Sequence, residues 1–176
     1  MIFIRLSYSL LPPRIRDIFW RIGMKLGDIL GGEVINVQPD VSVKAAVELM
    51  NKYEIGCIVV KDNDEPVAIV TERDVLSKIV CQCRNPERVK VSEIMSQPLL
   101  VGNVDMSMEE AAKFMFKQNI KKLPVVDNGK LVGLITLTGI VRVDHIEPVV
   151  IKVMNQLKKD GWVTPTRLNK VVGFYI

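Results

Sequence analysis

The chain repeats itself at a fixed spacing, and this internal repeat restricts the possible folds more than any other feature of the sequence. When residue n is placed above residue n + 65, identical residues stay in register without a gap. The matched pairs include Lys25 with Lys90, Ile29 with Ile94, Asp40 with Asp105, Ser42 with Ser107, Val60 with Val125 and Thr71 with Thr136. We expect two motifs, residues 24–88 and 89–146, which share one core because neither is large enough to bury one well alone.

Each motif is predicted to begin with a strand and a helix. Residues 33–40 are an apolar segment that ends in turn residues, a pattern typical of a strand that leads into a helix. Residues 42–54 then place Val43, Val47 and Met50 on one face of a helix, after an Asp and a Ser that are good N-caps. Residues 98–105 and 107–119 repeat this pattern in the second motif.

A hairpin and a final helix complete each motif. The apolar runs IGCIVV and PVAIV flank the turn DNDEP in the first copy, and LPVV and LVGLI flank DNGK in the second. The final helices are expected to start at Thr71 and Thr136. The predicted fold class is therefore α/β (α+β). Two βαββα motifs should pack about a pseudo-twofold axis, since each motif alone leaves one apolar sheet face bare.

Residues 1–23 precede the repeat as an N-terminal extension. Arg5, Pro12 and Pro13 interrupt its apolar start well short of the roughly 18 apolar residues of a membrane span. Most of its basic residues follow the apolar part, which is not the order found in signal peptides. An amphipathic surface helix and a segment foreign to the native product are both compatible with this stretch.

Residues 147–176 leave the repeat and are predicted to form a C-terminal helical tail. A first helix should end at an Asp-Gly stop, and a second should begin with Thr164 as N-cap and Pro165 at its first position. This order is typical of the opening of a helix-turn-helix domain that lacks its base-reading helix. We prefer a packing appendage, because specific DNA binding would have no obvious means; a truncated DNA-binding domain stays open.

A family likeness is carried by six segments of the chain: PDVSVKAAVELM, IGCIVV, PVAIVTERDVL, EIMSQPL, IKKLPVVD and LVGLITLTGI. In this order they resemble a pair of cystathionine beta-synthase (CBS) domains, the arrangement called a Bateman module. The resemblance implies that the chain binds an adenosine derivative in clefts between the two copies: AMP, ADP, ATP or S-adenosylmethionine. It also implies that occupancy of the clefts reports energy or metabolite status to an attached or partner protein.

Thr71 and Asp74 are the main candidate ligand residues in the first copy. They lie three apart at a predicted helix start, where free N–H groups can receive a phosphate and a carboxylate can accept hydrogen bonds from two ribose hydroxyls. The resemblance assigns Asp74 to the ribose and Thr71 to the ribose or phosphate side. The alternative is a capping box, in which Thr71 caps the helix and Asp74 reaches back to the first N–H. Arg73 is a weaker candidate, because a solvated charge is its commoner role.

The second copy departs from this pattern. Gly139 stands at the position equivalent to Asp74, so that cleft loses its sugar anchor but keeps Thr136 and Thr138. Lys121 and Lys122 stand where members of the family often carry a phosphate-binding cation. The two clefts should therefore be unequal, with one preferred ligand at Asp74.

The resemblance also predicts which residues share a cleft. It pairs Thr71 and Asp74 with one set, Ile120, Lys121 and Lys122, and pairs Thr136 and Thr138 with another, Ile55, Gly56 and Cys57. The adenine walls are expected to come from apolar residues that could equally be ordinary core: Val34, Ile35, Leu99 and Leu100.

Catalytic and metal chemistry find no support in the sequence. No Ser-His-Asp set, P-loop or GxGxxG fingerprint is present. The three cysteines, Cys57, Cys81 and Cys83, form no CxxC pair, and the single histidine, His145, has no ligand set around it. We expect no enzyme, no metal site and no required cofactor. Unpaired thiols are typical of a reducing compartment and predict a cytoplasmic location.

Three functions remain to be compared. The first is an adenosine-nucleotide sensor that forms a homodimer through its amphipathic helices and acts on an unknown effector protein. The second is a DNA-associated regulator that uses the tail and the basic N-terminal stretch, although charges are mixed along most of the chain, with a net charge of +4. The third is a structural dimerisation module with empty clefts. None of the three involves a membrane.

Overall fold

The computed structural model describes residues 25–30, 32–137 and 139. The predictions for the N-terminal extension, for the C-terminal tail, for Thr138 and for His145 lie outside the described residues. Two compact units make up the chain. Of the described residues, one unit comprises 25–30, 102–125, 134–137 and 139, and the other comprises Gly32–Val101 and Val126–Gly133.

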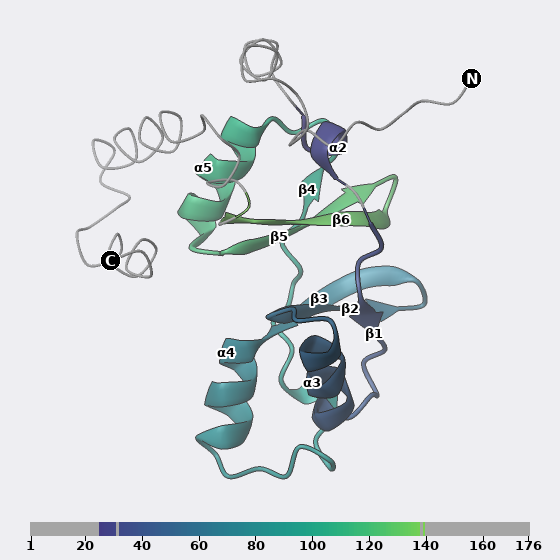
Figure 1. Cartoon of the computed structure of the whole chain (residues 1–176), viewed down its shortest axis with the longest axis vertical. Coiled ribbons are helices and arrows are strands. Elements are labelled where there is room, and N and C mark those ends of the chain that lie inside the picture. Colours follow the sequence, from purple (N-terminus) through teal and green to yellow (C-terminus); the bar gives the residue numbers. More distant parts are fainter. Residues whose placement is uncertain (1–24, 31, 138, 140–176) are drawn as a thin grey trace, which may run out of the picture. The chain divides into compact units, whose positions relative to one another are not determined.

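Each sequence copy contributes one three-stranded sheet (Figure 1). In the first sheet β1 runs parallel to β2 and β2 pairs antiparallel with β3, in the order β1-β2-β3. The second sheet has the order β4-β5-β6. The strands are β1 (Asn36–Val37), β2 (Cys57–Asp62), β3 (Glu65–Thr71), β4 (Gly102–Asn103), β5 (Lys122–Asp127) and β6 (Lys130–Thr136). The mixed α/β fold class is confirmed, although β1 and β4 are shorter than the apolar segments that predicted them.

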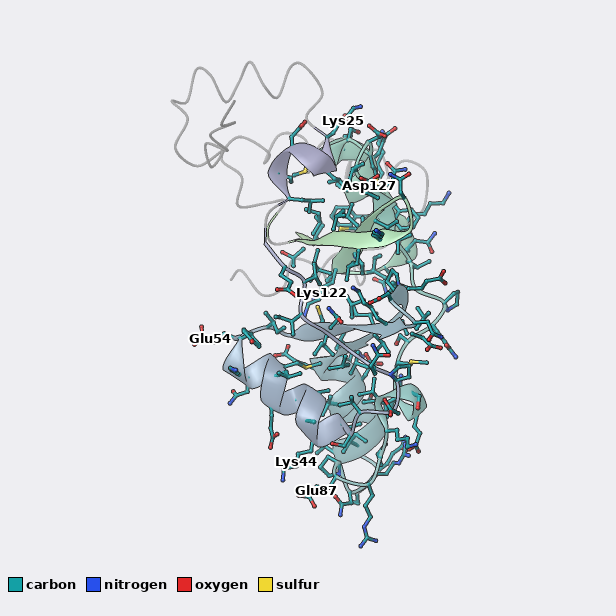
Figure 2. The ribbon with its side chains drawn as sticks, turned by 90° about the vertical axis from the view of Figure 1, so that its right-hand side faces the viewer. Lys25, Lys44, Glu54, Glu87, Lys122 and Asp127 are labelled. Carbon is teal, nitrogen blue, oxygen red and sulfur yellow. The ribbon has the colours of Figure 1, made fainter. Side chains whose placement is uncertain are left out.

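The helices predicted after Ser42, Ser107 and Thr71 are present with the predicted caps, whereas the helix predicted from Thr136 lies largely outside the described residues. Helix α3 (Val43–Lys52) starts at Ser42, whose hydroxyl accepts a hydrogen bond from the N–H of Ala45. Helix α5 (Met108–Gln118) starts at Ser107. Helix α4 (Glu72–Val75) follows β3 directly and continues as a π-helical turn over Leu76–Val80. Figure 2 shows Lys44 in the first turn of α3 beside Glu87, with which it forms an ion pair of 2.6 Å.

Both hairpins turn through the residues that the sequence indicated. Asn63 and Asp64 have positive φ angles of 49° and 66°, and Asn128 and Gly129 have 48° and 78°. Two central residues with positive φ define the type I′ turn, whose twist matches that of the flanking strands. Asn, Asp and Gly tolerate this conformation better than other residues, which explains their occurrence in both turns.

The segment that opens each copy packs on the sheet of the other copy. Helix α2 (Leu26–Ile29) donates N–H groups from Leu26 to Met106 O (2.8 Å) and from Gly27 to Val104 O (2.9 Å). Leu26 is fully buried in a cluster with members of α5 and β5, among them Met108, Met115 and Leu123. The compact units therefore do not coincide with the sequence repeats.

The segment that opens the second copy packs in the same way on the first copy, so the two copies exchange their opening segments. A 3₁₀ turn (Val91–Glu93) donates from Val91 N to Val41 O (2.8 Å), and Val43 N donates to Val89 O (2.9 Å). Val91 and Ile94 are fully buried against the first sheet and α3. No helix among the residues that the structure describes is both long enough and apolar enough to cross a membrane.

Candidate ligand site at the start of helix α4

Thr71 and Asp74 contact each other where β3 gives way to α4. Asp74 Oδ2 accepts hydrogen bonds from Thr71 N (2.9 Å) and from Thr71 Oγ1 (2.6 Å). In return, Asp74 N donates to Thr71 Oγ1 at 3.3 Å. This reciprocal arrangement is a capping box, because two backbone N–H groups that the helix leaves unpaired are each satisfied by a side chain. The capping alternative predicted for Thr71 and Asp74 is confirmed; the ribose role stays a prediction.

The second oxygen of Asp74 is held from two other segments. Oδ1 accepts a hydrogen bond from Lys78 Nζ (2.8 Å), one helical turn further on, and from Ser96 Oγ (3.1 Å). Lys78 Nζ also donates to the carbonyl oxygen of Ile94 at 2.5 Å. The backbone of Ser96 pairs with Ile69 of β3, with N–O distances of 2.8 Å and 3.2 Å. Asp74, only 9% exposed, is thus fixed to its own helix, to β3 and to the segment that opens the second copy.

These contacts keep the carboxyl of Asp74 ionised. Burial by itself would raise its pKa, because it disfavours the charged form. The hydrogen bonds from Lys78 and from the hydroxyl and N–H of Thr71, together with the charge of Lys78, outweigh burial and lower the pKa of Asp74 below its ordinary value. The site therefore presents an anionic acceptor and no proton to give.

The start of β2 lies beside Thr71 in the same copy. Cys57 is the register partner of Thr71, and Glu72 N donates to Gly56 O at 3.3 Å. Cys57 is buried and Gly56 is half-buried, whereas Arg73 is exposed. The first copy thus brings its own hairpin start and its own helix start to one end of its sheet. The pairing of Thr71 and Asp74 with Ile120, Lys121 and Lys122 remains a prediction.

The second copy repeats this geometry with one change. Leu137 N donates to Lys121 O at 2.9 Å, as Glu72 N does to Gly56 O. Thr136 Oγ1 accepts a hydrogen bond from Gly139 N at 2.9 Å, so Thr136 caps as Thr71 does. Gly139 is exposed and brings no carboxylate to the cap. The caps of the two copies therefore differ, and the inequality of the two clefts stays a prediction.

The remaining predicted residues differ in their surroundings. Lys121 is exposed, while Lys122 begins β5 and is half-buried. Ile55 and Ile120 are half-buried and each packs on the core of its own copy. The predicted adenine walls are all half-buried: Val34, Ile35, Leu99 and Leu100. Ile35 packs against the first core, in keeping with the structural alternative for this set.

Lys78 and Ser96 were not among the predicted site residues. Lys78 could have been found, because it lies four residues after Asp74 on a predicted helix, a spacing that brings opposite charges together. Ser96 lies 22 residues from Asp74, and no local pattern in the sequence connects the two.

A groove of about 600 Å³ lies between α3 and the start of α4. Its lining is mainly apolar: Val47, Met50, Asn51, Glu54, Ile55, Glu72, Val75 and Leu76. Leu76 is 58% exposed, and Val80, one turn further along, is 59% exposed. Figure 2 shows Glu54 just beyond the C-terminal end of α3. This helical face offers apolar surface that its own unit leaves uncovered.

The described residues include no group of three or more His, Cys, Asp or Glu side chains arranged to hold a metal ion. Cys57, Cys81 and Cys83 form no disulfide; Cys57 is buried, and the other two are exposed.

Comparison with known proteins identifies the repeated unit. The CBS domain family matches the chain twice, over residues 26–81 and 91–146. The chain belongs to the CBS-domain family. Because the two matches follow one another, it carries a tandem CBS pair, the Bateman arrangement that the sequence motifs resembled. The fold and family predictions are therefore confirmed.

Relatives of this CBS pair occur in archaea and bacteria. An uncharacterized protein of Methanopyrus kandleri is 38% identical over 69% of this chain and 63% of its own length. The CBS domain-containing protein YhcV of Bacillus subtilis is 34% identical over 62% of this chain and 78% of its own. A crystal structure of a CBS-domain-containing protein from Agrobacterium tumefaciens is 28% identical, with a TM-score of 0.63, over 68% of this chain and 92% of that one. The chain thus spans less than two thirds of the Methanopyrus relative.

Proposed function

We propose that this CBS pair is a cytoplasmic regulatory module that binds an adenosine nucleotide and does not transform it. The observation that carries the proposal is the ionised, buried carboxylate of Asp74, held at the start of α4 within a tandem CBS pair. No cofactor is needed for such a role. The nucleotide is the ligand, and the effector is another protein.

The chemistry of Asp74 suits a ribose. An ionised carboxylate only accepts hydrogen bonds, and the cis-diol of a ribose offers two hydroxyl donors. Hydrogen bonds to a charged acceptor are stronger than those between neutral groups. Placement of the nucleotide between the two copies, with Lys121 and Lys122 on the phosphate side, is carried over from the family resemblance.

A structural dimerisation module is the second candidate, and one observation favours it. Asp74 already accepts four hydrogen bonds from within the chain, as a purely structural carboxylate would. The exposed apolar face of α3, α4 and the π-helical turn after α4, which carries Leu76 and Val80, would provide the dimer contact. The two candidates share this dimer and differ in nucleotide binding.

Titration calorimetry with AMP, ADP, ATP and S-adenosylmethionine tests the proposal. We expect the wild type to bind at least one of them and Asp74→Ala to bind it at least tenfold more weakly. The matched control is Glu72→Ala, which removes an exposed carboxylate two residues earlier on the same helix and should bind as the wild type does.

Thermal unfolding of each variant accompanies the titrations, because Asp74 also caps α4. A folded Asp74→Ala with unchanged affinity would remove Asp74 from the site. A wild type that neither binds any of the four compounds nor gains thermal stability from them would favour the structural module.

A further inference from the structure

The carboxylate of Asp74 has no acceptor position left for a ligand. An ionised carboxylate offers about four lone-pair sites, two on each oxygen. The N–H and the hydroxyl of Thr71 occupy Oδ2, and the ammonium of Lys78 and the hydroxyl of Ser96 occupy Oδ1. A ribose diol brings two more donors, so two of these four contacts have to give way.

The two contacts on Oδ2 are the harder ones to lose. The N–H of Thr71 is fixed by the end of β3 and would be left without its cap. The hydroxyl of Thr71 donates at 2.6 Å and also accepts from Asp74 N, so its orientation is set from both sides.

The two contacts on Oδ1 are the easier ones to release. Ser96 is exposed, and its hydroxyl makes the longest of the four contacts, at 3.1 Å, so it can turn to water by a change of rotamer. The side chain of Lys78 is 35% exposed and has three donors, one of which already reaches Ile94 O.

We propose that Ser96 and Lys78 form a latch that occupies Oδ1 of Asp74 in the unliganded protein and releases it when a ribose diol binds. The latch rests on the proposed function and concerns the regulation of the same site. Ser96 and Ile94 both belong to the segment that opens the second copy, so opening the latch changes contacts made by that segment. Ligand occupancy is thereby transmitted from Asp74 to residues 94–96.

Ser96→Ala tests the latch, because it removes one competing donor and leaves the cap and Lys78 in place. The ligand is the tightest binder among AMP, ADP, ATP and S-adenosylmethionine. Loss of one competing hydrogen bond of ordinary strength should tighten its binding by about three- to tenfold. Ser96→Thr keeps the hydroxyl and should bind as the wild type does. The matched control is Ser92→Ala, which truncates another exposed serine of the same segment.

The 2′,3′-dideoxy analogue of the same ligand separates a latch from a merely structural contact. It has no diol to compete with Ser96, so Ser96→Ala and wild type should bind it equally. Unchanged or weaker binding of the natural ligand by Ser96→Ala would overturn the latch while leaving the proposed function intact. An equal gain for the dideoxy analogue would also overturn it. Absence of binding to both proteins would overturn the proposed function and the latch together.

Discussion

Asp74 stabilises the start of α4 at the same site where we propose that a nucleotide is bound. Its carboxylate closes the capping box of α4 and also ties Lys78 and Ser96 to the end of β3. The sequence predicted both the cap and the family's ligand role from a single T-x-x-D motif. It could not show that the proposed ligand would need carboxylate oxygens that are already occupied, because the donor Ser96 comes from a distant segment.

The lowered pKa of Asp74 predicts a dependence of stability on pH. A carboxyl whose folded-state pKa lies below its unfolded value of about 3.9 stabilises the fold above that value. This contribution is lost as the pH falls through the folded-state pKa. The difference in free energy of unfolding between wild type and Asp74→Asn should therefore be constant above about pH 5 and shrink below about pH 4.

Urea denaturation of both proteins between about pH 3 and pH 7 measures this difference. Glu87, Glu93 and Glu110 also have lowered pKa values, but they are present in both proteins and cancel. Parallel pH profiles of the free energy of unfolding would show that ionisation of Asp74 does not stabilise the fold.

At the scale of single elements, the two copies use equivalent helices with unequal caps. Ser42 caps α3 through one hydrogen bond, from Ala45 N. Ser107 caps α5 through the matching bond from Glu110 N, and in addition its own N–H and hydroxyl both donate to Glu110 Oε2. The repeat thus provides an internal comparison between a simple cap and a capping box.

We expect Ser42→Ala to lower the free energy of unfolding by about 1 kcal/mol, and Ser107→Ala to lower it by more, toward about 2 kcal/mol. Urea denaturation of the two variants measures the order. The double variant Ser107→Ala/Glu110→Ala, compared with Glu110→Ala alone, tells whether Glu110 is the source of the larger effect. In the Glu110→Ala background the hydroxyl of Ser107 has no carboxylate partner to lose. Equal effects of the two serine substitutions would show that the box adds nothing to the cap.

The proposed dimer contact is formed by α3, α4 and the π-helical turn that follows α4. Leu76→Lys places a charge on the exposed apolar face and should shift the protein from dimer toward monomer in sedimentation velocity. Val132→Lys is the matched control, because Val132 is also an exposed apolar residue but lies on β6. A wild type that is monomeric at every concentration, or a Leu76→Lys variant that stays dimeric, would contradict this contact.

Helices, hairpins and turns were predicted well because their signals are local. The apolar faces of α3 and α5 follow the helical period, and the Asn-Asp and Asn-Gly turns require residues that tolerate positive φ. The exchange of opening segments could not be predicted in this way. Leu26 and Ile94 occur in apolar stretches that would suit either core, and the choice between cores depends on tertiary packing.

For the molecule as a whole, this exchange means that each core depends on residues from both halves of the sequence. Leu26→Ala and Ile94→Ala each remove a fully buried side chain and should lower the free energy of unfolding by about 2–5 kcal/mol. Native-state hydrogen exchange should show that each substitution lowers amide protection in the copy that does not carry it. Leu26→Ala should expose amides of α5 and β5, and Ile94→Ala those of α3 and β2. Protection lost in the copy that carries the mutation would contradict the exchange.

The exchanged opening segments also bear on how such a pair can arise and be divided. A gene fragment cut at the repeat boundary would encode one copy without the opening segment that completes its core. The fragment would instead carry the opening segment that belongs in the core of the other copy. A protein made of one copy would have to borrow that peptide from a second molecule. Gene duplication and fusion would then join two already interlocked partners in one chain.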